Sequence, residues 1–192
     1  MPFLAKKLTI PDVLLIEPKI FPDARGFFAE AYKHVDFVGF GISKTIVQIN
    51  YSKSEKNVLR GLHFQANPMA QAKMIQVISG EIFDVAVDIR KDSPWYGKWV
   101  GEALSSENLK ILYVPEGFAH GFCVFSETAT ITYYCTNVYS KKDERGIIWN
   151  DPDLNINWPV KNPVISEKDA IFPRFKNMDA NFSYYTPEAD TR

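Results

Sequence analysis

Short runs of β-forming residues, each closed by a glycine or proline turn, recur along most of the chain. Residues 74–78 and 82–89 flank a Ser-Gly turn, and residues 111–114 and 121–125 flank a Pro-Glu-Gly turn. Residues 128–138 alternate between threonine-rich and apolar positions, which is typical of a half-buried strand. Three shorter runs complete the series: residues 13–16, 27–31 and 45–52. Many short strands between turns predict an all-β fold, a jelly-roll sandwich or barrel.

The run at 82–89 shows the alternation in most detail. One predicted face holds Phe83, Val85, Val87 and Ile89, and the other holds Asp84, Ala86 and Asp88. Together with residues 74–78 across the Ser-Gly turn, this run reads as a β-hairpin. Helical signals are few, so we expect only short peripheral helices near 34–40 and 166–170, with a capped turn at 105–108.

The length of the chain, 192 residues and 21.9 kDa, fits one domain. We find no internal repeat, no low-complexity segment and no linker that would divide it. The sequence therefore predicts a single domain over residues 1–182. The last ten residues, 183–192, are expected to form a flexible tail.

The charge balance excludes one broad class of partner. Lys and Arg total 22 and Asp and Glu total 23, for a net charge of −1, whereas a dedicated nucleic-acid binder shows a basic excess. No apolar run approaches the ~20 residues that span a membrane, and the N-terminus lacks the apolar core of a secretory signal. Cys123 and Cys135 form neither a metal-type pair nor a disulfide framework. We expect a cytoplasmic protein without a nucleic-acid or membrane partner.

A first candidate constellation lies in the segment 58–73, VLRGLHFQANPMAQAK. It places Arg60, His63 and Lys73 near glycine and proline turns. Positive neighbours disfavour the imidazolium form, so His63 would be neutral and able to act as a base. The alternative is a structural histidine with no chemical role.

A second constellation is VPEGFAHGF, residues 114–122. Its P-x-G-x-x-H pattern resembles the second signature of the cupin jelly rolls, in which the histidine is often a metal ligand. The first signature would need an H-x-H pair, but the residue two positions after His63 is Gln65. Two histidines without a third ligand make a weak metal site. We therefore expect a metal-free cupin, with His120 either in the pocket or packed at the barrel mouth.

Two further pairs have period-2 or strand spacing. Gln48 and Asn50 place both amides on one strand face, which would be either a solvated face or the polar wall of a pocket. Tyr133 shares its predicted face with Ile131 and Cys135, so it is expected to point inward as a core or a pocket residue. If this strand stays extended, Tyr139 lies about 20 Å further along, and only a long ligand such as a nucleotide-sugar could touch both tyrosines.

The segment DARGFFAE, residues 23–30, contains a glycine turn flanked by Arg25 and Glu30. An exposed ion pair between them would contribute little to stability. An arginine in such a place also suits bidentate contact with a phosphate.

Taken in order, these motifs resemble the dTDP-4-dehydrorhamnose 3,5-epimerase family. The resemblance rests on D-x-R-G-x-F-x-E, Q-x-N-x-S-x-S, L-R-G-L-H-x-Q, A-Q-x-K, SPWYGKWVGEALSSENLK, VPEGFAHGF, Y-x-C-T-x-x-Y and ERGIIWNDPDLNINWP, which cover roughly residues 10–170. It implies a homodimeric, cofactor-independent and metal-free cupin jelly roll. The implied activity is inversion of C3 and C5 of dTDP-4-dehydro-6-deoxy-D-glucose, which leads to dTDP-L-rhamnose.

The resemblance also implies residue roles. His63 falls on the family's catalytic base, Asp169 on the carboxylate that pairs with it, Tyr133 on the proton donor, and Lys73 on the cation near the sugar oxygen. Tyr139 matches the aromatic residue that stacks on thymine. The remaining substrate-binding positions are Arg25, Glu30, Gln48, Asn50, Arg60, His120, Glu144 and Lys168.

These residue types suit the reaction. C3 and C5 of a 4-keto sugar both lie α to the carbonyl, so epimerisation needs a base, a cation for the enolate oxygen, and an acid on the opposite face. Rival interpretations are a 3- or 5-epimerase or a 3,4-ketoisomerase on a dTDP-4-keto sugar, a non-catalytic sugar-binding cupin, and a metal-dependent cupin oxygenase. The ligand count disfavours the last of these.

Overall fold

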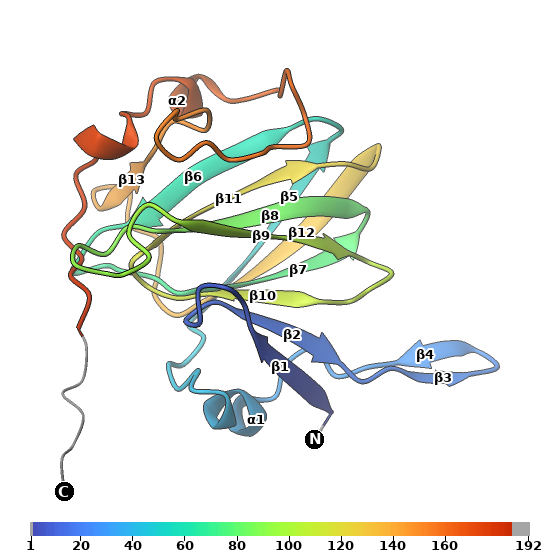
Figure 1. Ribbon diagram of the computed structural model, residues 1–192. Coiled ribbons are helices and arrows are strands. Elements are labelled where there is room, and N and C mark those ends of the chain that lie inside the picture. Colours follow the sequence, from blue (N-terminus) through green and yellow to red (C-terminus); the bar gives the residue numbers. More distant parts are fainter. Residues whose placement is uncertain (1, 186–192) are drawn as a thin grey trace, which may run out of the picture.

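The computed structural model describes residues 2–185, and its main body consists of two antiparallel sheets packed face to face (Figure 1). The six-stranded sheet has the order β1 (Phe3–Lys7), β2 (Leu14–Pro18), β10 (Ile111–Val114), β7 (Lys73–Ser79), β12 (Thr128–Cys135) and β5 (Gln48–Glu55). The five-stranded sheet has the order β13 (Glu144–Gly146), β6 (Leu59–Gln65), β11 (Phe118–Val124), β8 (Glu81–Asp88) and β9 (Trp99–Ser105). The expected all-β, cupin-type jelly-roll fold is confirmed.

Peripheral elements are few and short. A two-stranded hairpin, β3 (Phe21–Asp23) and β4 (Gly26–Phe28), projects away from the sandwich (Figure 1). The helices are α1 (His34–Gly39), α2 (Glu167–Ala170) and the 3-10 helix η1 (Phe175–Asn177), so both helix predictions are confirmed. Residues 105–108 form a turn rather than a helix, closed by hydrogen bonds in both directions between Ser105 and Asn108.

The predicted hairpin at the Ser-Gly turn is wrong. β7 hydrogen-bonds to β10 and β12, whereas β8 hydrogen-bonds to β11 and β9, so the two strands belong to different sheets. Gly80 has a φ of +85°, and a Cβ atom there would lie 2.1 Å from the carbonyl oxygen of Thr128. The glycine therefore serves a turn that leads the chain from one sheet to the other.

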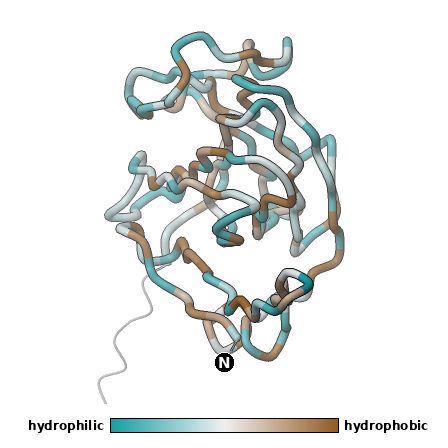
Figure 2. Tube along the Cα trace, turned by 90° about the vertical axis from the view of Figure 1, so that its right-hand side faces the viewer, coloured by the Kyte–Doolittle hydropathy of each residue, from teal (hydrophilic) through white to brown (hydrophobic). Residues whose placement is uncertain are grey.

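The predicted alternation in β8 is correct, and both of its faces are buried. Phe83, Val85 and Val87 belong to an outer core cluster with residues of the 147–182 segment, such as Leu154 and Phe182. The opposite face points between the two sheets, where Ile82 and Ala86 join the main core. Hydrophobic and hydrophilic residues are interspersed along the coloured part of the trace (Figure 2). No helix within residues 2–185 is long and apolar enough to cross a bilayer.

The C-terminal segment packs against the five-stranded sheet before the described residues end. Ser183 forms a bridge with Lys91, and the backbone N–H of Tyr184 donates to the Lys91 carbonyl at 2.7 Å. The first residues of the predicted tail are thus held against the domain, and residues 186–192 lie outside the described residues. The division into a 1–182 domain and a tail stays a prediction.

Candidate active site

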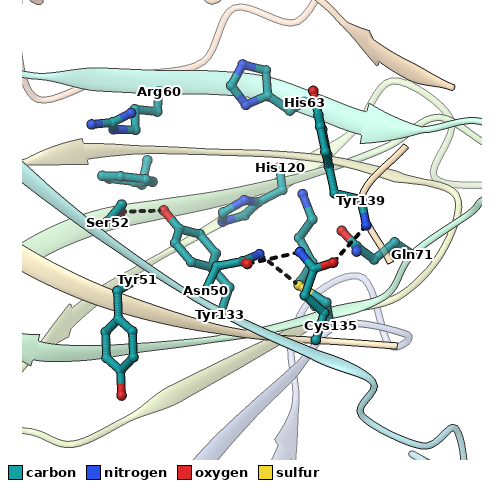
Figure 3. A pocket seen from close by; sticks show the side chains of 13 residues that line it. Asn50, Tyr51, Ser52, Arg60, His63, Gln71, His120, Tyr133, Cys135 and Tyr139 are labelled. Carbon is teal, nitrogen blue, oxygen red and sulfur yellow. Dashed lines mark hydrogen bonds between the residues drawn. The ribbon is translucent and has the colours of Figure 1, made fainter. Parts of the chain in front are cut away.

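A cavity of about 420 Å³ opens between the two sheets (Figure 3). Its lining comes from three strands of one sheet (β5, β7, β12), two of the other (β6, β11) and two loop residues. Eight of the residues singled out in the sequence line it: Gln48, Asn50, Arg60, His63, Lys73, His120, Tyr133 and Tyr139. Segments far apart in the chain therefore meet at one polar pocket inside an otherwise apolar sandwich.

His63 is paired with a carboxylate supplied by the C-terminal segment. Its Nε2 lies 2.9 Å from Oδ1 of Asp169, which is nearly fully buried on α2. Ser166 caps α2 by accepting from the Asp169 backbone N–H at 3.1 Å, and the Gly61 N–H donates to Asp169 Oδ2 at 3.2 Å. Burial alone would raise the pKa of Asp169, but the bonds from His63 and Gly61 hold that pKa below its usual value.

Two glycines set the backbone approach that places the histidines. Gly61 of L-R-G-L-H and Gly121 of A-H-G-F meet where β6 and β11 pair, and His63 stands directly opposite His120 in that register. A Cβ atom on Gly61, whose φ is +136°, would lie 2.5 Å from the Cα atom of Gly121. Both motifs thus need a glycine within two positions of the histidine, because any larger residue would push the two strands apart.

Tyr133 points into the cavity from β12, as the alternation predicted (Figure 3). Its hydroxyl lies 3.0 Å from the Ser52 hydroxyl on β5. Burial raises the pKa of Tyr133 to about 12. The phenol therefore keeps its proton at neutral pH and can donate it.

Tyr139 lies at the same cavity as Tyr133, which corrects the extended-strand expectation. β12 ends at Cys135, so the chain turns back before Tyr139 instead of carrying it about 20 Å away. The Tyr139 hydroxyl donates to Glu144 Oε2 at 2.9 Å, and Lys168 Nζ lies 2.7 Å from Glu144 Oε1. These three residues form a hydrogen-bonded chain at the rim of the pocket.

The amide wall predicted on β5 is present. Gln48 Nε2 donates to Asn50 Oδ1 at 2.9 Å, and Gln48 Oε1 accepts from the Tyr139 backbone N–H at 2.9 Å. Asn50 also points its Nδ2 at the Cys135 sulfur, 3.8 Å away. Arg60 is held by Ser54 Oγ, which accepts from its Nε at 3.0 Å. Gln48, Asn50 and the Tyr139 backbone are therefore oriented by one another, whereas Arg60 is oriented by Ser54.

Arg25 and Glu30 are not brought to this cavity within one chain. Arg25 lies on the β3–β4 hairpin, exposes most of its side chain and pairs with Asp23 at 2.6 Å. The ion pair considered from the sequence, between Arg25 and Glu30, is absent from residues 2–185. Both residues keep their binding role only as a prediction.

Sequence reasoning missed several residues of the pocket. Ser52, Gln71, Phe122 and Cys135 line it, and Asp84 lies just behind it on β8, bonded to His120. Ser52 falls in the period-2 series of Gln48 and Asn50, so its position could have been found from that spacing. No group of three or more His, Cys, Asp or Glu side chains within residues 2–185 is arranged to hold a metal ion.

Comparison with known proteins agrees with this geometry. The profile of the dTDP-4-dehydrorhamnose 3,5-epimerase family matches residues 7–177. A protein of that name from Shigella flexneri is 54% identical over 174 residues, which are 90% of this chain and 96% of that protein. The crystal structure of the dTDP-6-deoxy-D-glucose-3,5-epimerase of Legionella pneumophila Philadelphia 1 in complex with dTDP-4-keto-L-rhamnose superposes with a TM-score of 0.92. It is 42% identical, and the match covers 96% of this chain and all of that one.

A more distant structural neighbour has a narrower activity. A 3'-monoepimerase from Streptomyces bikiniensis, in complex with dTDP-quinovose, is 32% identical with a TM-score of 0.83, covering 88% of this chain and 86% of its own. The Shigella and Legionella proteins, which have higher sequence identity to this chain, are both named as 3,5-epimerases. The family profile, the jelly-roll fold and the cavity lined by His63 and His120 agree with one another. The chain therefore belongs to the dTDP-4-dehydrorhamnose 3,5-epimerase family.

Proposed function

We propose that the protein epimerises dTDP-4-dehydro-6-deoxy-D-glucose at C3 and C5 to dTDP-4-dehydro-L-rhamnose, a step in dTDP-L-rhamnose biosynthesis. The observation that carries the proposal is the meeting of His63, Lys73 and Tyr133 at one cavity, with Asp169 bonded to His63 from behind. This set supplies a base, a cation and an acid around a single site.

His63 acts as the base. Its Nε2 is bonded to Asp169, which leaves Nδ1 as the ring nitrogen without a partner within residues 2–185. Nδ1 takes the proton from the sugar carbon α to the carbonyl, and the electron pair of the broken C–H bond moves into the enolate, placing negative charge on O4. Asp169 stabilises the imidazolium that forms and fixes the ring orientation.

Lys73 and Tyr133 complete the exchange. The Lys73 ammonium stabilises the negative charge on O4. Tyr133 then donates its phenol proton to the carbon from the opposite face of the sugar ring, and the configuration inverts. His63 then releases its proton to solvent and Tyr133 regains one, so each inversion is a balanced proton exchange that needs no redox partner.

The rim residues suit the nucleotide part of the substrate. Tyr139 offers an exposed ring for stacking on thymine, and Gln48 and Asn50 offer amides to its polar edge. Arg60 and Lys168 supply positive charge for the diphosphate. These local charges meet the needs of the ligand although the whole chain carries a net charge of −1.

Solvent deuterium exchange tests the reaction and separates it from its rivals. In D2O a double epimerase labels both C3 and C5 of the recovered sugar nucleotide. Labelling at one carbon would favour a monoepimerase, which the Streptomyces neighbour makes a specific second candidate. Binding without any labelling would indicate a sugar-binding protein and would contradict the proposal.

We further propose that the protein is a homodimer in which Arg25 and Glu30 serve the pocket of the other copy. The β3–β4 hairpin exposes Phe21, Phe27 and Phe28 to solvent, and the edge strand β5 exposes Ile49 and Tyr51. Apolar surface of this kind marks an interaction site. A second copy would both cover it and bring the predicted ligand residues to a cavity.

Mixing two inactive variants tests the shared site. If Arg25 serves the other copy, combining Arg25→Ala with His63→Ala restores one complete pocket in each mixed dimer. Activity that stays at the level of the separate variants would contradict the exchange, and a monomeric mass by native mass spectrometry would contradict the dimer.

The two cysteines are free and buried, which suits a reducing compartment, so we also propose a cytoplasmic location.

A further inference from the structure

A fully buried carboxylate lies behind the cavity and has no part in the reaction described above. Asp84, on β8, has no solvent exposure, and its Oδ1 is 2.7 Å from Nε2 of His120 on the neighbouring strand β11. Its second oxygen, Oδ2, has no hydrogen-bond partner within residues 2–185. Leaving a buried carboxylate oxygen without a partner costs stability, so the residue calls for an explanation other than folding.

Other buried aspartates show what a structural carboxylate looks like in this protein. Asp88, four positions along the same face of β8, accepts from Arg90 through both oxygens and from the Ser93 hydroxyl. Asp151 accepts three backbone N–H groups, shared between its two oxygens. Both of these carboxylates are fully partnered, whereas Asp84 has a single histidine on one oxygen.

The polar groups nearest to Asp84 belong to the catalytic cavity. His120 lines that cavity, and its ring stands edge-on to the ring of Tyr133 at 6.4 Å between centroids (Figure 3). Lys73 lines the same cavity from β7 of the opposite sheet. Within residues 2–185 the Lys73 side-chain nitrogen has no hydrogen bond and no ion pair, so no directly bonded group holds its charge.

Charges around Lys73 decide whether it keeps its proton. Burial lowers the pKa of Lys73, and Asp84 on β8 and Glu144 on β13 act in the opposite direction, as Cys135 on β12 would if ionised. Lys168 on α2 lowers it further. Burial raises the pKa of Cys135 too, so that thiol stays neutral. Glu144 is already bonded to Lys168, which leaves Asp84 as the anion without a cationic partner of its own.

The pKa of Asp84 depends on burial and on charges from the same group of residues. Burial raises the pKa of Asp84, and His120 and Lys73 lower it. The negative charge of Asp84 also raises the pKa of Tyr133. The remaining ionisable side chains at the cavity are Arg60, His63, Tyr51 and Tyr139.

We propose that Asp84 is a positioning residue: it fixes the His120 ring through the Nε2–H bond and supplies the buried negative charge that keeps Lys73 an ammonium ion at the substrate's O4. The inference rests on the proposed role of Lys73 in holding the enolate oxygen. In this arrangement the positive charge that Lys73 offers to the enolate oxygen is fixed in the cavity wall, with Lys73 on one sheet and Asp84 on the other. Because the charge is built into β8, it needs no rearrangement when the substrate binds.

Replacing Asp84 with asparagine removes the charge and keeps the shape and the acceptor oxygen. The pH profile of kcat/KM reports the pKa values of essential groups in the free enzyme. We expect its alkaline limb to move to lower pH by about one unit or more in Asp84→Asn. At a pH above the new limb, one unit corresponds to a loss of about tenfold. A merely structural role would lower kcat/KM at every pH and leave the limb in place.

Asp88→Asn is the matched control, because Asp88 is a buried aspartate on the same face of the same strand but bonded to Arg90. It is expected to lower the melting temperature without moving the alkaline limb. A second control replaces Lys73 with arginine, whose guanidinium stays protonated. In a Lys73→Arg background that retains measurable turnover, Asp84→Asn should no longer shift the limb.

The outcomes separate this inference from the proposed function. If the wild-type protein does not epimerise the dTDP-4-keto sugar, the proposed function fails. If the wild type is active and Asp84→Asn keeps an unchanged alkaline limb, the inference about Asp84 is overturned and the function stands. A shift of equal size in Asp88→Asn would also overturn it, because the effect would then not be specific to this carboxylate.

A spectroscopic measurement covers the case in which Asp84→Asn does not fold. The chain has only three histidines, so their ring ¹⁵N signals can be assigned with His34→Gln and His120→Gln variants. In the wild type, His120 should carry a proton on Nε2 at neutral pH. An unprotonated Nε2 would exclude the bond to Asp84 and overturn the inference without any variant of that residue.

Discussion

Two histidine–carboxylate pairs lie next to each other in this protein, and their surroundings differ. His63 and His120 are partners across β6 and β11, and each bonds an aspartate through Nε2. The His63 side chain is 25% exposed and its aspartate has a second donor in Gly61, whereas the His120 side chain is 6% exposed and its aspartate has no second donor within residues 2–185.

The consequence is that the two aspartates are tuned in opposite directions. The pKa of Asp169 is lowered and the pKa of Asp84 is raised. A histidine that takes up and releases a proton at the substrate must be accessible from the cavity, and a firmly hydrogen-bonded carboxylate keeps its ring in place. A pair that only supplies charge can be sealed in the protein. In the proposed mechanism, the same residue types therefore serve two tasks, separated by burial and by the number of hydrogen-bond donors.

The largest expected effect comes from breaking the exposed pair at the histidine. His63→Ala should lower kcat by about 10²–10⁴-fold, the usual range for removal of a general base. Binding of dTDP should stay within a few fold of wild type, because the proposed nucleotide contacts lie at the rim. Steady-state kinetics and calorimetry measure both quantities.

His34→Ala serves as the control for this variant. His34 lies on α1, where its Nδ1 is 3.1 Å from the Tyr32 hydroxyl, and it does not line the cavity. It should retain wild-type kcat. Full turnover by His63→Ala would remove the base assignment and, with it, the contrast between the two pairs.

The sequence could predict the His63–Asp169 pair only in part, and the His120–Asp84 pair hardly at all. The L-R-G-L-H and A-H-G-F motifs indicate His63 and His120, and the period of β12 places Tyr133 inward. Asp169 lies about a hundred positions after His63, and only the resemblance to a family connects them. Local spacing contains no information on which distant carboxylate a histidine meets.

Asp84 and the Ser-Gly turn show why the rest was missed. Alternation assigns Asp84 to a face with Ala86, but it does not tell solvent from the interior of a sandwich that contains a polar cavity. The turn at Gly80 has the same residues as a hairpin turn, and it connects two sheets because other strands, β10, β12, β11 and β9, complete those sheets. Both errors arise from contacts between segments far apart in sequence.

A smaller effect concerns stability, and its sign should differ between the two aspartates. The folded state lowers the pKa of Asp169, so its ionised form stabilises the fold above the unfolded value of about 3.9, and this contribution is lost as pH falls through the folded pKa. The folded state raises the pKa of Asp84, so its contribution is present below the unfolded value and is lost as pH rises through the folded pKa.

At pH 7 we therefore expect Asp169→Asn to lower the melting temperature and Asp84→Asn to leave it unchanged or raise it. A loss of about 1–3 kcal/mol for the charged hydrogen bonds of Asp169 corresponds to roughly 2–12 °C in a chain of this size. Scanning calorimetry at pH 7 and near pH 4 measures the difference, which should shrink at the lower pH for Asp169→Asn. Equal destabilisation by both variants at pH 7 would show that the two pairs have the same role in stability.

The smallest expected effect is that of a chelator. A histidine that binds a metal almost always donates its other ring N–H to a carboxylate, a carbonyl or water, and this protein has two histidines bonded to carboxylates side by side. A catalytic metal site commonly needs three protein ligands, and residues 2–185 contain no group of three. Dialysis against EDTA should therefore leave kcat within experimental error of the untreated protein. Loss of turnover on chelation, restored by a divalent cation, would make the two histidines joint ligands of one ion and would end the distinction between a proton-transferring pair and a charge-supplying pair.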